Sequence, residues 1–181
     1  MITKCERNEI MELGGKNAYQ QLEAIYRELP THEQRILQNG LQIGVAMNEY
    51  TDSFEYGDFL IRNVTGIDHE TGVIQVADFL RVGQTVQFHL RDSTSAILDL
   101  KQTLQISMAE NRPFAPASLL AFTCNGRGSD FFEASSGDAQ TISETIGDLP
   151  VAGFFAAGEI GPVSGRNFMH GFTCSCIWFG E

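Results

Sequence analysis

Basic residues are scarce in this sequence. It has 12 lysines and arginines against 23 aspartates and glutamates, a formal net charge of -11, and no cluster of basic residues that offsets this locally. A surface of this sign repels phosphate backbones and anionic lipid headgroups. The composition therefore argues against binding to nucleic acid or to a membrane surface.

Long apolar runs are also absent. No stretch approaches the roughly 18 apolar residues that a membrane-spanning helix needs. The chain starts with MITKCERNEIMEL, which is charged where a signal peptide is apolar. We expect no membrane association and a cytoplasmic location.

Cysteine is too rare and too unevenly placed for a disulfide framework, with Cys5, Cys124, Cys174 and Cys176 as the four thiols. A chain of 181 residues with 43% hydrophobic residues can build one core without cross-links, so we expect free thiols. Cys174 and Cys176 would lie on one face of a strand and could bind a metal, but no second Cys/His pair accompanies them. Two small core residues are the favoured interpretation, and we predict no metal and no cofactor.

Hydrophobic periodicity predicts one α+β domain over residues 1–181, with an antiparallel-rich mixed β-sheet flanked by helices. In the first half we expect a strand at Glu9 to Leu13 and an amphipathic helix from Ala18 to Leu29. A capping box of Thr31 and Gln34 predicts a second short helix, which Asn39 and Gly40 end in a left-handed conformation.

Alternating polar and apolar residues follow. The strands expected here are Leu41 to Met47, Phe59 to Ile67, Val73 to Phe79 and Thr85 to Leu90. Asp68 to Gly72 has the composition of a hairpin turn, and a meander is the most economical topology for the last three strands. Val86, Phe88 and Leu90 should face the core, because they alternate with polar residues.

The second half begins with the longest predicted helix, Ser93 to Glu110, capped by Asp92 or Ser93 and packed on the sheet. Ser118 to Cys124 is almost continuously apolar, which is typical of a central strand covered on both faces. The remaining elements expected are a surface helix at Ser136 to Ile146, a strand at Val151 to Ala157, a glycine-rich turn at Gly158 to Pro162, and a last strand at His170 to Phe179.

Four sequence blocks, in this order, resemble the C-terminal domain of FIST proteins. They are Leu60 to Asp68, Gly83 to Asp92, Phe122 to Gly128, and GFFAAGEIGP at Gly153 to Pro162 leading to HGFT at His170 to Thr173. The block at Gly153 to Pro162 is the most specific, and the resemblance covers nearly the whole chain.

The resemblance implies a sensory module of a signal-transduction protein that binds small molecules such as amino acids. It also implies a preceding FIST N-terminal domain, which this sequence does not contain. The partners expected are therefore a small-molecule ligand, an amino acid or similar metabolite, and a FIST N-terminal domain or signalling partner. The family carries over no catalytic residues, so we expect no enzymatic activity.

The candidate site combines a cation and an anion beside glycines. Arg127 lies between Gly126 and Gly128, and Glu159 follows Gly158. A guanidinium and exposed backbone N–H groups suit the carboxylate of an amino acid, and a carboxylate suits its ammonium group. We therefore expect both side chains in one pocket, with Phe154, Phe155 and Phe172 as its apolar wall.

Four further residues are reserves for this site: Arg62, Asn63, Arg91 and His170. For each arginine the alternative is an ion pair with a nearby acid, and for the glycines the alternative is a role in tight turns. For His170 the alternative is a hydrogen-bonded histidine near a sheet edge.

Two other classes of function stay open. A hydrolase or transferase could use Cys124 as the nucleophile and His170 as its base, since a strand end before a glycine-rich turn presents nucleophiles in several enzymes. In that case Cys124→Ser would abolish turnover, whereas the sensor interpretation expects this change to leave function intact. A protein-interaction module would show an exposed apolar patch where a missing domain docks.

Overall fold

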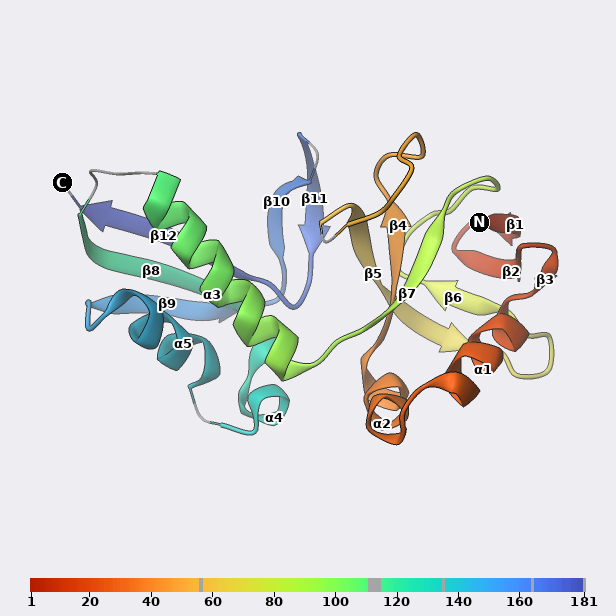
Figure 1. Ribbon diagram of the computed structural model, residues 1–181, viewed down its shortest axis with the longest axis horizontal. Coiled ribbons are helices and arrows are strands. Elements are labelled where there is room, and N and C mark those ends of the chain that lie inside the picture. The colour runs from red at the N-terminus through yellow and green to blue at the C-terminus, as the bar shows by residue number, and fades with distance from the viewer. Residues whose placement is uncertain (56, 111–114, 135, 164, 181) are drawn as a thin grey trace. The chain divides into compact units, whose positions relative to one another are not determined.

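A computed structural model describes residues 1–55, 57–110, 115–134, 136–163 and 165–180. The chain divides into two compact units, Met1–Arg91 and Asp92–Glu181, which we call unit 1 and unit 2 (Figure 1). Helices and mostly antiparallel strands occur in both, which confirms the α+β class. The predicted single sheet is wrong in detail, because the strands of the described residues form three separate sheets.

Unit 1 contains a curled antiparallel sheet and two helices. In chain order its elements are β1 (Ile2–Glu6), β2 (Glu9–Leu13), β3 (Lys16–Asn17), α1 (Ala18–Glu28), α2 (Thr31–Gly40), β4 (Leu41–Ala46), β5 (Phe59–Ile67), β6 (Ile74–Val76) and β7 (Val86–Leu90).

The sheet order in unit 1 is β1-β2-β6-β5-β4-β7, with β3 paired to β2. The predicted meander is therefore wrong for its third strand, since β7 pairs with β4 and not with β6. The two ends of the sheet meet: the Ile2 N–H donates to the Gln84 carbonyl at 2.8 Å, and the Gly83 N–H donates to the Ile2 carbonyl at 2.9 Å.

The core of unit 1 lies inside this curl. Its fully buried members include Ile2, Ile10, Ile43 and Ile74. Val86 and Phe88 of β7 pack against it, as the alternating pattern predicts. The hairpin between β5 and β6 is also confirmed, since Asp68 accepts the Gly72 N–H at 2.7 Å and Gly72 has φ 75°.

The ends of the two helices correct one prediction. Asn17 caps α1 by accepting the Gln20 N–H. The capping box of α2 is wrong, because the Gln34 side chain donates to carbonyls at the end of α1, those of Tyr26 and Leu29. Gly40 is helical and has no left-handed φ; a Cβ there would lie 2.6 Å from the Arg91 carbonyl oxygen, so close packing requires the glycine.

Unit 2 packs helices on one side of a three-stranded sheet. Its elements are α3 (Ser93–Glu110), β8 (Pro116–Cys124), the short 3₁₀ helix η1 (Asn125–Arg127), α4 (Ser129–Phe132), α5 (Gly137–Ile146), β9 (Val151–Ala156), β10 (Glu159–Val163), β11 (Arg166–His170) and β12 (Cys174–Gly180). The sheet order is β12-β8-β9, and β9 runs parallel to β8.

The long helix α3 packs on this sheet as predicted. Figure 1 shows α3 lying along the β12-β8-β9 sheet. Asp92 caps α3 by accepting the Ser95 N–H, and Leu100 and Leu104 form a core with Leu119 of β8 and Ile142 of α5. β8 is central, but the expectation that both its faces are covered is wrong. Side chains on the opposite face of the sheet are exposed, including Phe154, Ile177 and Phe179.

The glycine-rich turn predicted at Gly158 to Pro162 is mostly strand. Glu159–Val163 pairs with Arg166–His170 as the hairpin β10–β11, so His170 belongs to this hairpin and not to the last strand. No helix in the described ranges is long and apolar enough to cross a membrane.

Candidate functional site

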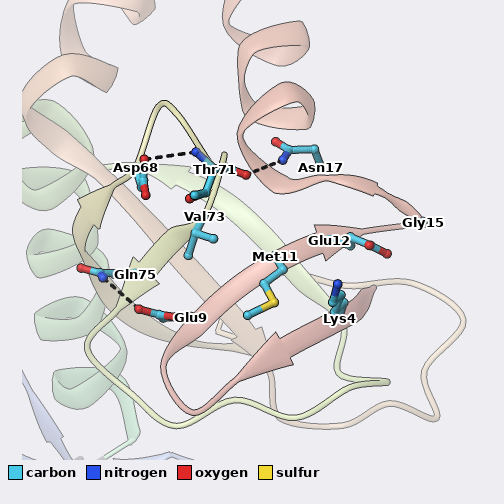
Figure 2. Close-up of a pocket in the computed structure, with 10 residues that line it drawn as sticks. All are labelled: Lys4, Glu9, Met11, Glu12, Gly15, Asn17, Asp68, Thr71, Val73 and Gln75. Atoms are coloured by element: carbon cyan, nitrogen blue, oxygen red, sulfur yellow. Dashed lines mark hydrogen bonds between the residues drawn. The ribbon is translucent and has the colours of Figure 1, made fainter.

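A groove of about 530 Å³ lies in unit 1 on the outer side of β2 and β6 (Figure 2). Several of its polar groups form hydrogen bonds with one another. Gln75 Nε2 donates to Glu9 Oε1 at 3.0 Å, and Asn17 Nδ2 donates to the Thr71 carbonyl at 3.0 Å. Hydrogen bonds from Thr71 and from the Glu70 N–H lower the pKa of Asp68. None of the predicted site residues lines this groove.

A smaller cavity of about 300 Å³ lies in unit 2. The side chains that line it include Thr123, Arg127, Ser129, Asp138 and Phe155, and we call it the Arg127 cavity. Glycines and alanines of β8, β9 and α5 complete its walls. Small-molecule sites combine such apolar walls with a few fixed polar groups, and their volumes start near 300 Å³.

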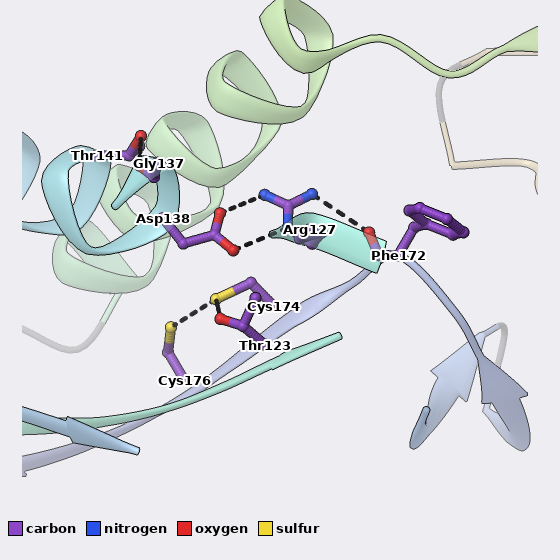
Figure 3. Close-up of polar contacts among 8 residues, drawn as sticks. All are labelled: Thr123, Arg127, Gly137, Asp138, Thr141, Phe172, Cys174 and Cys176. Atoms are coloured by element: carbon purple, nitrogen blue, oxygen red, sulfur yellow. Dashed lines mark hydrogen bonds and ion pairs between the residues drawn. The ribbon is translucent and has the colours of Figure 1, made fainter. Parts of the chain in front are cut away.

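Arg127 forms a buried bidentate ion pair at this cavity (Figure 3). Its Nε donates to Asp138 Oδ2 at 3.0 Å and its Nη2 to Asp138 Oδ1 at 2.5 Å. Nη1 donates to the Phe172 carbonyl at 3.2 Å, and the guanidinium carbon lies 5.2 Å from the Phe132 ring centroid. Both charged side chains are less than a tenth exposed. Burial acts to lower the pKa of Arg127, but the hydrogen bond and charge of Asp138 outweigh it and raise that pKa.

The local fold explains this placement. Arg127 ends the 3₁₀ turn that follows β8, and Asp138 lies in the first turn of α5, where a carboxylate also interacts favourably with the helix dipole. Gly126 is required because a Cβ there would overlap the Phe172 ring. Phe172 itself has a left-handed φ of 62°, a conformation that costs a non-glycine residue about 1–2 kcal/mol.

Glu159 contacts Thr173, the residue that follows the Phe172 whose carbonyl Arg127 binds. Thr173 Oγ1 donates to Glu159 Oε2 at 2.5 Å, whereas Oε1 is buried and has no hydrogen-bond partner within the part of the chain that is described. The prediction that Glu159 and Arg127 share one pocket is not met by this cavity, because Glu159 does not line it. The two side chains instead hold neighbouring residues of the turn, Thr173 and Phe172.

The other predicted site residues of unit 2 lie either at the Arg127 cavity or at the β10–β11 hairpin. Gly128 lines the Arg127 cavity, and Gly158, with φ 153°, begins the hairpin that carries Glu159. His170 Nε2 lies 3.0 Å from the Gly161 carbonyl oxygen. That carbonyl can only accept, so Nε2 carries the proton and is not free to act as a base.

The pairing that an enzyme would need is not formed. Cys124 is buried, and no hydrogen bond links it to His170, both of which lie within the described ranges. Of the three phenylalanines expected in the wall, Phe154 and Phe155 belong to the strand that lines the cavity and Phe172 does not line it. Successive residues of a strand face opposite sides: Phe155 lies beside Thr123 on the cavity side, whereas the Phe154 ring packs on Phe122 on the other face.

The reserve residues Arg62, Asn63 and Arg91 all lie in unit 1. Arg62 Nε donates to Asp78 Oδ2 at 2.6 Å, which is the ion pair considered as its alternative role. Asn63 Oδ1 accepts from Gln42 Nε2, and Arg91 Nη2 donates to the Asn39 carbonyl. None of them lines the Arg127 cavity.

Sequence reasoning missed Asp138, Thr123 and Ser129, which all line the cavity. A signal for Asp138 was available, since a buried arginine needs an acid and Asp138 is the acid in the first turn of α5, the helix predicted at Ser136 to Ile146. Nothing in the pattern around Thr123 or Ser129 distinguishes them from other hydroxyl residues. Among the residues that the structure describes, no group of three or more His, Cys, Asp or Glu side chains is arranged to hold a metal.

Comparisons with known proteins point to one family. The profile of the FIST C domain family matches residues 18–162. The uncharacterized proteins Mb0898c of Mycobacterium bovis and Rv0628c of Mycobacterium tuberculosis are each 43% identical over 179 residues, which is 99% of this chain and 46% of theirs. The chain thus spans about half the length of these relatives. No solved structure matches it.

Proposed function

We propose, from the premise that this chain belongs to the FIST C domain family, that it is a small-ligand-binding sensory domain of a signal-transduction protein. The ligand is an amino acid or a similar small metabolite, and it binds in the Arg127 cavity. The observation that carries this proposal is the buried Arg127–Asp138 pair in a wall that is otherwise mostly apolar.

The pair matches the charges of an amino acid. Three of the five N–H groups of Arg127 donate to described residues, which leaves two for a ligand carboxylate. Each oxygen of Asp138 accepts one of these bonds and has capacity for another, so an ammonium group can bind there. Because the pair is neutral overall, it favours a zwitterion over a simple anion or cation.

Thr123 and Ser129 add hydroxyl groups to the same cavity, and Phe155 supplies an aromatic face. Phe155 is 61% exposed without a ligand, so a ligand that covers its ring removes apolar surface from water. The proposal assigns binding to this cavity and no chemical turnover.

A thermal-shift screen of the amino acids and small metabolites tests the proposal. A ligand present at a hundred times its Kd stabilises the native state by about 2.7 kcal/mol, which raises the melting temperature by several degrees. For a ligand found in this way, Phe155→Ala should weaken binding about fivefold to thirtyfold, as expected for the loss of 1–2 kcal/mol of apolar contact.

Phe179→Ala is the matched control for this measurement. Phe179 is also in unit 2 and 48% exposed, but it does not line the cavity. Calorimetry should give the parent Kd for this variant. The proposal fails if no compound raises the melting temperature, or if Phe155→Ala binds the ligand found as tightly as the parent does.

A second candidate function is supported by the exposed apolar face of unit 2. Phe154 is 63% exposed, Ile177 49% and Phe179 48%, and all three lie on the side of the β12-β8-β9 sheet opposite α3 and α5. Contiguous apolar surface of this kind marks protein-interaction sites. The partner we propose is a FIST N-terminal domain. The part of a longer relative that this chain does not match could supply such a domain.

Mixing tests this second function. We expect the chain to form a complex with the part of Rv0628c that it does not match, detected by sedimentation velocity. Phe154→Ser together with Ile177→Ser should abolish the complex, while Ile25→Ser, an exposed apolar position of unit 1, should not. If the parent chain, the double variant and Ile25→Ser all bind equally well, the interface is not on this face.

A further inference from the structure

Two thiols lie side by side on strand β12, on the face that packs against the helices of unit 2. Cys174 and Cys176 are two residues apart, and their Sγ atoms are 3.9 Å from each other (Figure 3). Thr123 of the neighbouring strand β8 donates its hydroxyl to Cys174 Sγ at 3.4 Å. Both side chains pack against the core of unit 2, as expected of two small core residues, and neither lines the Arg127 cavity.

The surroundings make the two sulfurs chemically different. A hydrogen bond from the Cys176 thiol is the main cause that lowers the pKa of Cys174, and the Thr123 hydroxyl and the Arg127 charge act in the same direction against burial. The hydrogen bond to Cys174 and burial raise the pKa of Cys176. These shifts favour the thiolate at Cys174 over the thiolate at Cys176, and the thiolate is the reactive form of cysteine.

The pair is not fully buried. The Arg127 cavity is lined by Thr123, whose hydroxyl contacts Cys174 Sγ, so the cavity extends to the immediate neighbour of this sulfur. Cys124, by contrast, is buried, and Cys5 lies alone in unit 1.

We propose that Cys174 and Cys176 form a redox-active dithiol that a hydroperoxide converts reversibly into a disulfide within strand β12. Cys174 is the attacking thiolate and Cys176 is the resolving thiol.

The reaction has two steps. The Cys174 thiolate attacks one oxygen of hydrogen peroxide, the oxygen–oxygen bond breaks, and Cys174 becomes a sulfenic acid while the released hydroxide takes a proton to form water. The Cys176 thiol then attacks the Cys174 sulfur. A sulfur–sulfur bond forms, the sulfur–oxygen bond breaks, and the thiol proton leaves with the hydroxyl group as a second water. Two thiols lose two hydrogens in total, and one peroxide is reduced to two waters.

Strand geometry explains why the product is easily reduced again. Residues two apart in a strand have Cα atoms about 6.6 Å apart, near the long end of the range that disulfides tolerate. The two sulfurs must also approach from 3.9 Å to about 2.05 Å. A bond closed under such constraint is more reducible than a relaxed one.

Peptide mass spectrometry of the peroxide-treated chain tests the proposal. Trypsin releases residues 167–181 as one peptide with both cysteines, and its mass should fall by two hydrogens and recover with dithiothreitol. Cys176→Ser should stop at a Cys174 sulfenic acid that dimedone traps. Cys174→Ser should slow oxidation of Cys176 about tenfold or more, because Cys176 can then react with peroxide only through its own thiolate, which burial still disfavours. Thr123→Val should slow the reaction of Cys174.

Cys5→Ser and Cys124→Ser are the controls, and both should react like the parent. Several results would overturn the proposal, and the first two need only the parent protein. In the first, Cys174 and Cys176 stay reduced while Cys5 is oxidised. In the second, the disulfide joins two chains and does not form within the peptide. In the third, Cys176 of the Cys174→Ser variant reacts at the parent rate.

Discussion

Asp138→Ala is expected to lower the free energy of unfolding by about 3–5 kcal/mol, the cost of leaving a buried charge without its partner. The change removes both acceptors of the Arg127 fork, whose side chain is 6% exposed and cannot move into water without disrupting the turn around Phe172. An arginine guanidinium is not deprotonated in proteins, so Arg127 stays charged throughout the neutral range even without Asp138. Urea unfolding at pH 6 and at pH 9 should therefore show the same loss.

A double variant separates the cost of the unpaired charge from the value of the pair. Arg127→Met with Asp138→Leu replaces both charges by apolar side chains, and such replacements of buried pairs are often close to neutral. We expect it to be more stable than Asp138→Ala alone. A loss below about 1 kcal/mol for Asp138→Ala would mean that the pair is solvated like a surface ion pair, which would also remove the basis for the ligand site.

Gly153→Ala is expected to destabilise unit 2 by about 3 kcal/mol, the upper end of the range for overpacking. A Cβ at this position would overlap the backbone carbonyl of Ala121 on the paired strand β8. A backbone atom cannot rotate away as a side chain can, so β8 and β9 would have to separate. Gly153 also lines the Arg127 cavity, so ligand binding should fall with stability.

Gly171→Ala is the matched control. Gly171 lies in the same unit, a Cβ there has open space, and its φ is not left-handed. Its melting temperature should not fall, since a glycine-to-alanine change at an unstrained, open position stabilises a protein by about 0.4–1 kcal/mol. If both variants melt alike, the close approach of β8 and β9 does not constrain this strand pair.

Local pattern predicted the helices and many strands well, because their signals are contained in consecutive residues. Ala18–Glu28 and Ser93–Glu110 follow their apolar periods, and Phe59–Ile67 matches its predicted bounds. Pairing between strands is a non-local property, and there the predictions failed: β7 pairs with β4, and Glu159–Val163 forms a strand where its glycines and proline indicated a turn.

The candidate site shows the same division. The flanking glycines located Arg127 correctly at the end of a strand and on a cavity, but its partner Asp138 lies eleven residues later, in the first turn of α5. Glu159, the acid beside a glycine, begins the β10–β11 hairpin. Its carboxylate accepts a hydrogen bond from Thr173 and does not line the cavity. A sequence pattern identifies which residues are charged near a turn, whereas the fold decides which of them meet.

The two hydrophobic clusters have a consequence for how the protein is made. Every member of the first cluster lies between Ile2 and Phe88, and every member of the second lies between Leu100 and Trp178. A nascent chain could therefore complete the first cluster while the second is still being translated, since domains generally fold as units during synthesis. The strands β8, β9 and β12, with their exposed apolar face, are translated after the first cluster, so this face emerges when the core of unit 1 can already be buried.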